Sequence, residues 1–423
     1  MFSEIEALNY RCLRYVSQAM APFQVLIGPN ASGKSTFLDV VAFLADVVRE
    51  RDGVAAAVST RAPDIRDLSW MRQGDAFEFV VEAVIPETLR RRPNGGYARV
   101  RYEVRVGIHS ETGETSLLAE TLWLRPEPLE QETRPPRQRS LFPMPEPPRE
   151  SIVLLSRKQT QAGWRRILNK VPDSGNDYFR SETSGWNNLF RLGPRRSALA
   201  NLPEDEDKFP VSIWFRRLLM EGVQRLALNS AALRLPNPPG SPRRFQPDGS
   251  NLPWVVKDLE DSAPERLREW VAHVRTALPD LRAIRTVERP EDRHRYLMLD
   301  YESGLQAPSW LVSDGTLRLL ALTVLAYIPN LEGIYLIEEP ENGIHPRAVE
   351  TVFQSLSSVY GAQVLLATHS PVILSLAEPS QVLCFDRTRE GATDIVRGSE
   401  HPRLREWKGE TDLGTLFASG VLG

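Results

Sequence analysis

The stretch LIGPNASGKSTFL, residues 26–38, places two glycines, a lysine and several hydroxyl side chains between an apolar run and a helical pattern. The apolar run, 23–27, is typical of a buried strand. After the loop, apolar residues recur at the three- and four-residue intervals of a helix with one buried face: Phe37, Val40, Val41, Phe43, Leu44, Val47 and Val48. Strand, glycine-rich loop and helix in this order form the arrangement of a phosphate-binding loop.

The loop fits the pattern GxxxxGK[ST] without a gap, and its glycines allow backbone N–H groups to point inward around phosphate oxygens. The helix that starts near Gly33 turns its positive end toward the same charge. We expect Lys34 to reach the β and γ phosphates, Ser35 to ligate Mg²⁺ and Thr36 to donate a further hydrogen bond. The predicted nucleotide-binding residues of the loop are Gly28, Pro29, Asn30, Ala31, Ser32, Gly33, Lys34, Ser35 and Thr36.

A phosphate loop of this kind needs an acidic partner, because Mg²⁺ takes oxygen ligands and the attacking water must be held in line. The stretch IYLIEEPENGIHP, 334–346, supplies one: four apolar residues predict a buried strand, and two carboxylates follow at its end. Open α/β sheets bind ligands at the carboxyl ends of their strands. We therefore expect Glu338 to hold the metal through water, and Glu339 to orient or deprotonate the attacking water.

The composition of the 423 residues is that of a globular protein, with 41% hydrophobic and 25% charged residues. No apolar run approaches the roughly 20 residues that span a bilayer, and the N-terminus lacks a secretory signal. We therefore expect a cytoplasmic protein with no membrane partner. The formal net charge of −3 is not that of a polycation, so DNA contact would need a local patch. Cys12 and Cys384 have no metal- or redox-type neighbours and are expected to be small buried hydrophobes.

The order of the predicted elements indicates an α/β protein whose nucleotide-binding core is divided between the two ends of the chain. Near the N-terminus, runs between turn signals predict an antiparallel β meander at 77–85, 97–108 and 116–124. The segment 125–149 is rich in proline and charge and predicts an exposed linker.

The remainder of the chain predicts an insert followed by a second α/β stretch. The insert carries helices at about 211–228 and 263–278, and the second stretch carries helices at 316–327 and 348–359 and strands at 334–337 and 363–367. The predicted domains are the N-terminal core, 1–124, the inserted subdomain, 125–290, and the C-terminal core, 291–423.

Two further segments are weak signals when taken alone: SDGTLRLLAL, 313–322, is a serine-capped helix, and LLATHSP, 365–371, is a strand that ends in a polar turn. In order, however, GPNASGKST, SDGT, IYLIEEPENGIHP and ATHSP resemble the ABC-class ATPases of the RecF, SMC and OLD-like branch, known as AAA_21-type ATPases. The resemblance covers both ends of the chain, about half of it in motif-bearing segments. DGSNLP, 248–253, and the tail LGTLFASGVLG are similar to a bacterial subgroup with many members encoded in anti-phage defence loci.

This resemblance implies an ABC-type ATPase head with a mixed sheet and helices, an antiparallel β meander and an inserted, mostly helical subdomain. It gives Ser313 and Gly315 the signature role, in which the segment reaches across a dimer to the γ-phosphate bound by the other subunit. It makes His369 the switch histidine that contacts the γ-phosphate.

The resemblance also places Asn342, Gly343 and His345 in the loop that crosses the dimer interface, although His345 could instead cap the following helix. A glutamine usually lines the metal site in this class. Gln73, in MRQGD before a predicted strand, is the candidate, and its alternative is a simple turn residue.

Two residues depart from the common pattern. The signature is SDGT where transporter-type members have LSGGQ, and the metal-binding carboxylate is Glu338 where aspartate is commoner. Both fit the OLD-like branch.

The expected enzyme is an ATPase with ATP and Mg²⁺ as cofactors and a homodimer that closes around ATP. In one interpretation, closure activates an effector in a DNA-linked or anti-phage defence pathway, and basic residues contact DNA: Arg90, Arg91, Arg92, Arg99, Arg101, Arg105, Arg157, Lys158, Arg165, Arg166 and Lys170, the last five around Trp164. The alternative for these residues is a solvated, charge-balanced surface.

Two other functions compete with this one. A transporter nucleotide-binding subunit is disfavoured by the atypical signature and the long charged insert. A protein-binding regulator would use 125–290 to dock a toxin or nuclease without DNA contact. An intrinsic nuclease is not expected, because the roughly 40 residues after Asp386 are too few for a nuclease domain; a partner would cut nucleic acid.

Overall fold

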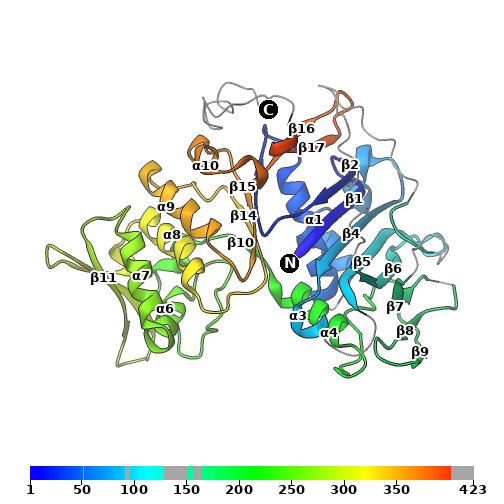
Figure 1. The fold of residues 1–423 in the computed structure, drawn as a ribbon, viewed down its shortest axis with the longest axis horizontal. Helices are drawn as coiled ribbons and strands as arrows, with labels where there is room; N and C mark the ends of the chain where they lie inside the picture. Colours follow the sequence, from blue (N-terminus) through cyan, green and yellow to red (C-terminus); the bar gives the residue numbers. More distant parts are fainter. Residues whose placement is uncertain (51, 91–95, 128–150, 156–162, 173, 402–423) are drawn as a thin grey trace. The chain divides into compact units, whose positions relative to one another are not determined.

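The computed structural model describes residues 1–50, 52–90, 96–127, 151–155, 163–172 and 174–401, which form two compact units (Figure 1). The first unit combines residues 1–21 and 28–223 with residues 383–401, and the second combines 22–27 with 224–382. These units are defined by contacts, whereas the three sequence-based domains are defined by motifs and composition. The three-part division stays a prediction.

An antiparallel sheet dominates the first unit. Its strand order among the described residues is β2 (Leu13–Ala19), β1 (Phe2–Tyr10), β4 (Ala76–Val84), β5 (Tyr97–Ile108), β6 (Thr115–Pro126), β7 (Arg165–Lys170), β8 (Tyr178–Arg180) and β9 (Asn187–Leu189). The predicted meander is confirmed as β4 to β6. Strands β7 to β9 lie in the range expected to be mostly helical and continue the sheet.

Helix α1 (Lys34–Arg49) packs its predicted apolar face on this sheet. The ring of Phe43 lies 6.1, 5.5 and 5.3 Å, between centroids, from the rings of Tyr10, Phe77 and Phe79. Each of these four side chains is fully buried. Because aromatic side chains bury large apolar areas, this cluster fixes the helix that follows the phosphate loop.

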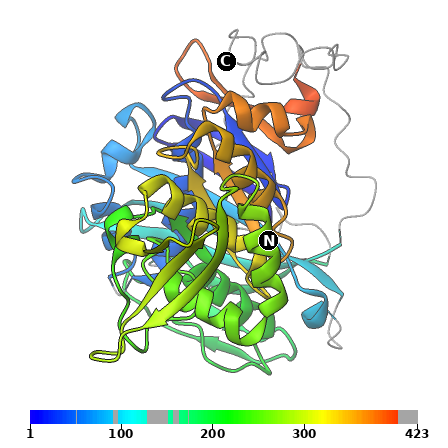
Figure 2. The ribbon, with the colours of Figure 1, turned by 90° about the vertical axis from the view of Figure 1, so that its left-hand side faces the viewer.

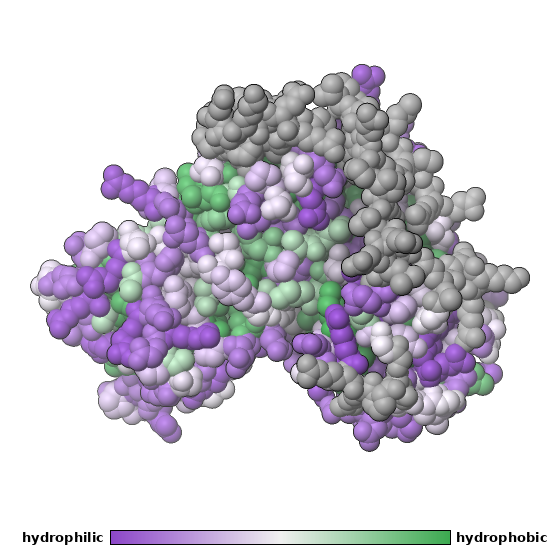
Figure 3. Space-filling view, in the orientation of Figure 1, coloured by the Kyte–Doolittle hydropathy of each residue, from purple (hydrophilic) through white to green (hydrophobic). Residues whose placement is uncertain are grey.

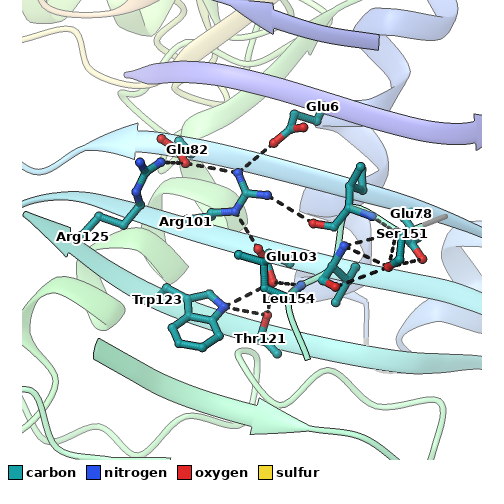
Figure 4. Close-up of polar contacts among 12 residues, drawn as sticks. Glu6, Glu78, Glu82, Arg101, Glu103, Thr121, Trp123, Arg125, Ser151 and Leu154 are labelled. Atoms are coloured by element: carbon teal, nitrogen blue, oxygen red, sulfur yellow. Dashed lines mark hydrogen bonds and ion pairs between the residues drawn. The ribbon is translucent and has the colours of Figure 1, made fainter. Parts of the chain in front are cut away.

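The opposite face of the sheet carries buried carboxylates (Figure 4). Glu78 and Glu82 alternate along β4 with the aromatic residues beneath α1, so they point the other way. The segment 151–154 lies against these carboxylates: Glu78 accepts a hydrogen bond from the N–H of Ile152 at 2.7 Å, and Glu103 accepts one from the N–H of Leu154 at 2.9 Å. Glutamate side chains of the sheet therefore accept the hydrogen bonds of these N–H groups, which do not belong to a strand.

Arg101 neutralises part of this cluster. Its guanidinium donates to Glu103 at 2.6 Å, Glu6 at 2.8 Å and Glu82 at 3.2 Å. Burial by itself would lower the pKa of Arg101, but the surrounding carboxylates, Glu103 first, outweigh burial and raise the pKa. Arg101 therefore stays charged inside the unit.

Several residues of the expected basic patch are not available to nucleic acid. Arg101, Arg166 and Lys170 are buried, and Nζ of Lys170 donates to the carbonyl of Arg196 at 2.6 Å. The expectation of a surface patch is wrong for these three, because alternate strand residues face a covered side of the sheet. Arg99 and Arg105 form ion pairs with Glu82 at 3.8 Å and Glu78 at 3.6 Å. Four members lie outside the described residues: Arg91, Arg92, Arg157 and Lys158.

The rest of the first unit is made of short elements. They are α2 (Val54–Ser59), α3 (Glu87–Arg90), α4 (Pro210–Arg217) and the antiparallel pair β16 (Val382–Arg387) and β17 (Thr393–Arg397). The helix expected at about 211–228 is wrong in its second half. A π-helical turn at Leu218–Gly222 and strand β10 (Val223–Leu226) follow α4, and Gly222 ends the helical path.

In the second unit, three parallel strands form the centre: β3 (Phe23–Ile27) pairs with β15 (Gln363–Ala367), and β15 pairs with β14 (Ile334–Glu338). All three predicted strands are confirmed. Helices α8 (Asp314–Thr323) and α9 (Pro346–Ser357) follow the predicted order, whereas α10 (Pro371–Leu376) was not predicted; α9 packs against both others. Parallel strands buried on both faces explain the continuous apolar runs.

The second unit also contains a smaller antiparallel sheet, β11 (Leu281–Glu288), β12 (Arg295–Tyr301) and β13 (Gln306–Pro308), beside α6 (Leu252–Ser262) and α7 (Pro264–Val274) (Figure 2). The short helix α5 (Ser230–Arg234) precedes them. The helix expected at about 263–278 begins one residue later and ends at Val274, with proline at its first position.

Hydrophilic residues cover most of the surface drawn over the β11 and α7 region in Figure 3. Among the described residues, no helix combines the length and the apolar character needed to cross a membrane.

Candidate functional site

The phosphate loop in the first unit needs its two glycines. Gly28 has φ 145° and Gly33 has φ 107°, values that side chains rarely allow. A Cβ on Gly28 would lie 2.1 Å from the carbonyl oxygen of Phe385, and one on Gly33 would lie 2.2 Å from Oγ1 of Thr393. The loop therefore packs tightly on the β16–β17 pair, and there is no space for a side chain at Gly28 or Gly33.

Lys34 lies inside the loop that it follows. Its Nζ donates hydrogen bonds to the carbonyls of Gly28 at 2.8 Å and Pro29 at 2.9 Å, and the residue is 7% exposed. Oγ of Ser32 is buried and has no hydrogen-bond partner among the described residues. The loop thus carries a buried positive charge and a buried hydroxyl without a hydrogen-bond partner among the described residues, two groups that can interact with an anion.

The N-terminus of α1 adds to this positive character. Gly33 caps the 16-residue helix without a side-chain hydrogen bond, and its first turn contains no acidic residue. The first amides of a helix lack internal partners, and the helix dipole places positive charge there. Lys34, Ser35 and Thr36 form this first turn, and their contacts with phosphate stay a prediction.

The two predicted acidic residues end β14 in the second unit. Oε1 of Glu338 lies 2.6 Å from Nη2 of Arg225 in β10. Glu339 has φ 48°, an uncommon value for a residue with a side chain, and its N–H donates to the carbonyl of Ala367 at 2.8 Å. Nδ2 of Asn342 donates to Oε2 of the exposed Glu339. The hydrogen bond to β15 therefore stabilises the uncommon backbone conformation of Glu339, whose carboxylate is exposed. Backbone strain of this kind is often found at functional sites.

The signature segment begins α8. Oγ of Ser313 accepts a hydrogen bond from the N–H of Thr316 at 3.2 Å, and Ser313 is exposed. A Cβ on Gly315 would lie 2.6 Å from the carbonyl oxygen of Gly343. The first turn of α8 therefore packs on the loop that contains Asn342 and Gly343, which explains the glycine in SDGT.

His369 lies between β15 and α10 and is half-buried. Its N–H donates to Oε1 of Glu341 at 3.1 Å, and Oγ1 of Thr368 donates to the same oxygen at 2.6 Å. Glu341 was not singled out from the sequence. The available signal was a third carboxylate in EEPEN, directly after the two that were chosen.

The other predicted residues have plainer surroundings. Nδ1 of His345 accepts a hydrogen bond from the N–H of Arg347 at 3.2 Å, so the helix-capping alternative is observed. Gln73 is exposed at the end of the 3-10 turn Trp70–Arg72, with Gly74 and Asp75 between it and β4, and its metal role stays a prediction. Cys384 is 5% exposed as expected, and burial raises the pKa of its thiol to about 12. Cys12 is only half-buried.

Mg²⁺ binding stays a prediction for this chain. Among the described residues, no three His, Cys, Asp or Glu side chains group together as a ready-made metal cage. Mg²⁺ typically binds through one or two protein oxygens together with phosphate and water. Ser35 in the first unit carries a hydroxyl and Glu338 in the second a carboxylate, and the metal role of each stays a prediction.

The chain is similar to known proteins in sequence and in fold. A family model described as "AAA domain, putative AbiEii toxin, Type IV TA system" matches residues 23–375. The chain is similar to the crystal structure of an SMC head bound to the C-terminal winged-helix domain of ScpA, with a TM-score of 0.53 and 13% identity over 93% of this chain and 97% of that chain.

Two further SMC heads are similar to the chain. One is from Pyrococcus furiosus, bound to the C-terminal domain of ScpA, with a TM-score of 0.49 and 12% identity over 93% of this chain and 95% of that chain. The other is from Thermotoga maritima, with a TM-score of 0.42 and 9% identity over 94% and 98%. At these identities the likeness shows the fold alone, and the match with the TM-score of 0.53 confirms the expected α/β head architecture.

Proposed function

The chain belongs to this AAA-domain family of P-loop ATPases, and on that premise we propose that it binds and hydrolyses ATP with Mg²⁺. The observation that carries the proposal is the preformed cradle, in which Nζ of Lys34 rests on the carbonyls of Gly28 and Pro29. An anion of suitable size can replace these carbonyls as the partner of the ammonium group. The β and γ phosphates of ATP are such anions.

The proposed roles divide between binding and chemistry. Lys34 and the amides at the start of α1 would bind the phosphates. Ser35 would ligate Mg²⁺ and Glu338 would hold it through water, and the metal would supply positive charge against the developing phosphate charge. Glu339 orients the attacking water or accepts its proton, and His369 contacts the γ-phosphate. The strained backbone and exposed carboxylate of Glu339 support this assignment.

We further propose that two copies of the chain complete each site. Ser313 caps a helix whose N-terminus is exposed, so the signature can present a hydroxyl and a positive helix end to a nucleotide on a second copy. ATP would then join two surfaces, and phosphate release would remove the charge between them. The dimer would open on hydrolysis, as in other γ-phosphate switches.

Two substitutions test the enzymatic proposal. Glu339→Gln should keep ATP binding while hydrolysis falls about 10²- to 10³-fold, the usual effect of removing one positioned catalytic group. Lys34→Ala should instead lose nucleotide affinity. Phosphate release and fluorescent-nucleotide titration measure the two effects, with the exposed Glu332→Gln as a matched control. Wild-type turnover by Glu339→Gln would contradict the assignment.

The proposed output of the switch is control of an effector protein, a nuclease or toxin, in a DNA-linked or anti-phage defence pathway. The family description, which names a toxin and a toxin–antitoxin system, supports this direction. A second candidate is a regulator that docks such a partner without touching DNA. Arg101, Arg166 and Lys170 are among the basic residues expected to contact DNA in the first candidate function. Because all three are buried, their positions favour the second candidate.

DNA binding separates the two candidates. The Glu339→Gln protein loaded with ATP should bind DNA in a salt-dependent manner if basic residues contact phosphates. Absence of binding at low salt, together with a stable complex with the product of a neighbouring gene, would favour the regulator.

A further inference from the structure

In the second unit, the loop 339–343 after β14 is hydrogen-bonded to three successive residues, 367–369, at the end of β15. We call 339–343 the acidic loop and 367–369 the switch segment. The carbonyl of Ala367 accepts a hydrogen bond from the N–H of Glu339 at 2.8 Å. Oγ1 of Thr368 and the N–H of His369 both donate to Oε1 of Glu341, at 2.6 and 3.1 Å. A single side chain, that of Glu341, thus makes two of the three links.

The other carboxylate oxygen of Glu341 lacks such contacts. Oε2 is buried and has no hydrogen-bond partner among the described residues. An unpaired buried carboxylate oxygen is costly, so fold stability alone is a poor reason for a glutamate at this position. Oε1, in contrast, gains two charge-assisted hydrogen bonds, which are roughly twice as strong as neutral ones.

We propose that Glu341 is a positioning residue that sets the place of His369 relative to Glu339. The inference rests on the proposed function, in which these two side chains act on the γ-phosphate and the attacking water. Glu341 follows Glu339 by two residues, and its side chain accepts a hydrogen bond from the N–H of His369. A shift of the loop that carries Glu339 and Glu341 should therefore also move His369. Thr368 is buried and His369 half-buried, which leaves the imidazole able to reach a ligand while its backbone is fixed.

The contact has a specific kinetic consequence. Loss of the hydrogen bonds in Glu341→Ala should misplace His369 and lower kcat by about 10- to 100-fold, because small misplacements of a catalytic group have effects of this size. KM for ATP should change little, since the phosphate loop is untouched. Glu341→Gln keeps an acceptor oxygen for both donors and should lose clearly less activity.

A double substitution separates positioning from general damage. If Glu341 acts through His369, Glu341→Ala combined with His369→Ala should be no slower than the slower single variant. A merely structural role would instead multiply the two losses. Glu350→Ala, an exposed glutamate on α9, is the matched control and should leave kcat unchanged.

Hydrogen exchange gives a readout that does not depend on activity. The amide of His369 should exchange about tenfold faster or more in Glu341→Ala than in wild type, and Glu341→Gln should retain most of the protection. If the wild-type protein proves inactive, the proposed function fails, yet this measurement still judges the contact. Unchanged His369 exchange, multiplied kinetic losses, or a Gln variant as slow as the Ala variant would each overturn the inference.

Discussion

Glu338, the proposed metal ligand, is paired with a cation. Nη2 of Arg225 lies 2.6 Å from Oε1 of Glu338, and the side chains are 55% and 26% exposed. A carboxylate that binds Mg²⁺ must reorganise such a contact, so the arginine competes with the metal. The pair joins residues 113 positions apart, which is why motif reasoning found Glu338 and not Arg225.

Substitution of the arginine should therefore tighten metal binding. Arg225→Ala should raise the affinity of the nucleotide-bound protein for Mn²⁺ by about two- to fivefold, the range of an exposed ion pair. Calorimetric Mn²⁺ titration measures the change, and Arg217→Ala, from the exposed pair with Glu206, is the control. Weaker Mn²⁺ binding would show that Arg225 helps the site rather than competing for it.

Helix α4 depends on a residue far from its own sequence. Glu182 accepts hydrogen bonds from the N–H groups of Val211 and Ser212 at 2.9 and 2.7 Å and from Oγ of Ser212 at 2.6 Å. The helix has no side-chain cap at Phe209, so Glu182 satisfies its first amides. Burial, the largest influence, raises the pKa of Glu182.

Removal of this carboxylate should destabilise the first unit. Glu182→Ala leaves three donors unsatisfied and should lower the free energy of unfolding by about 1–3 kcal/mol in urea denaturation. The pKa of Glu182 is raised in the folded state. The free energy of unfolding of the wild type relative to that of Glu182→Gln should therefore be highest below pH 4.5, and this advantage in stability should be lost as the pH rises through the folded pKa. An advantage that grows with pH would contradict this assignment.

Elements with strong local patterns were predictable from the sequence. The strand at 363–367 was predicted with the observed bounds, and β14 differs by one residue, because an apolar run between turn signals describes a parallel strand well. Strand β2 was missed, since its pattern LRYVSQA is largely polar and it forms by pairing with β1. Strands β7 to β9 were missed, and β8 and β9 are only three residues long, too short to show the alternation that marks a strand.

At the scale of the molecule, the predicted motifs divide between the two compact units. The phosphate loop belongs to the first unit, and the carboxylate pair, the signature and the switch histidine belong to the second. Motif order was sufficient to predict the head fold, because each motif is a short strand, loop and helix segment. The segment 151–154 on the glutamate-lined face could not be predicted, since side chains of distant strands hold it.

The central claim is that one copy of the chain holds only part of each catalytic site and that ATP joins two copies. Light scattering of the Glu339→Gln protein with saturating ATP and Mg²⁺ tests it most directly. The account predicts a monomer without nucleotide and a dimer with ATP, reversed by the additional change Ser313→Arg at the signature. A strictly monomeric ATP-loaded protein, with wild-type activity undiminished at high dilution, would contradict it.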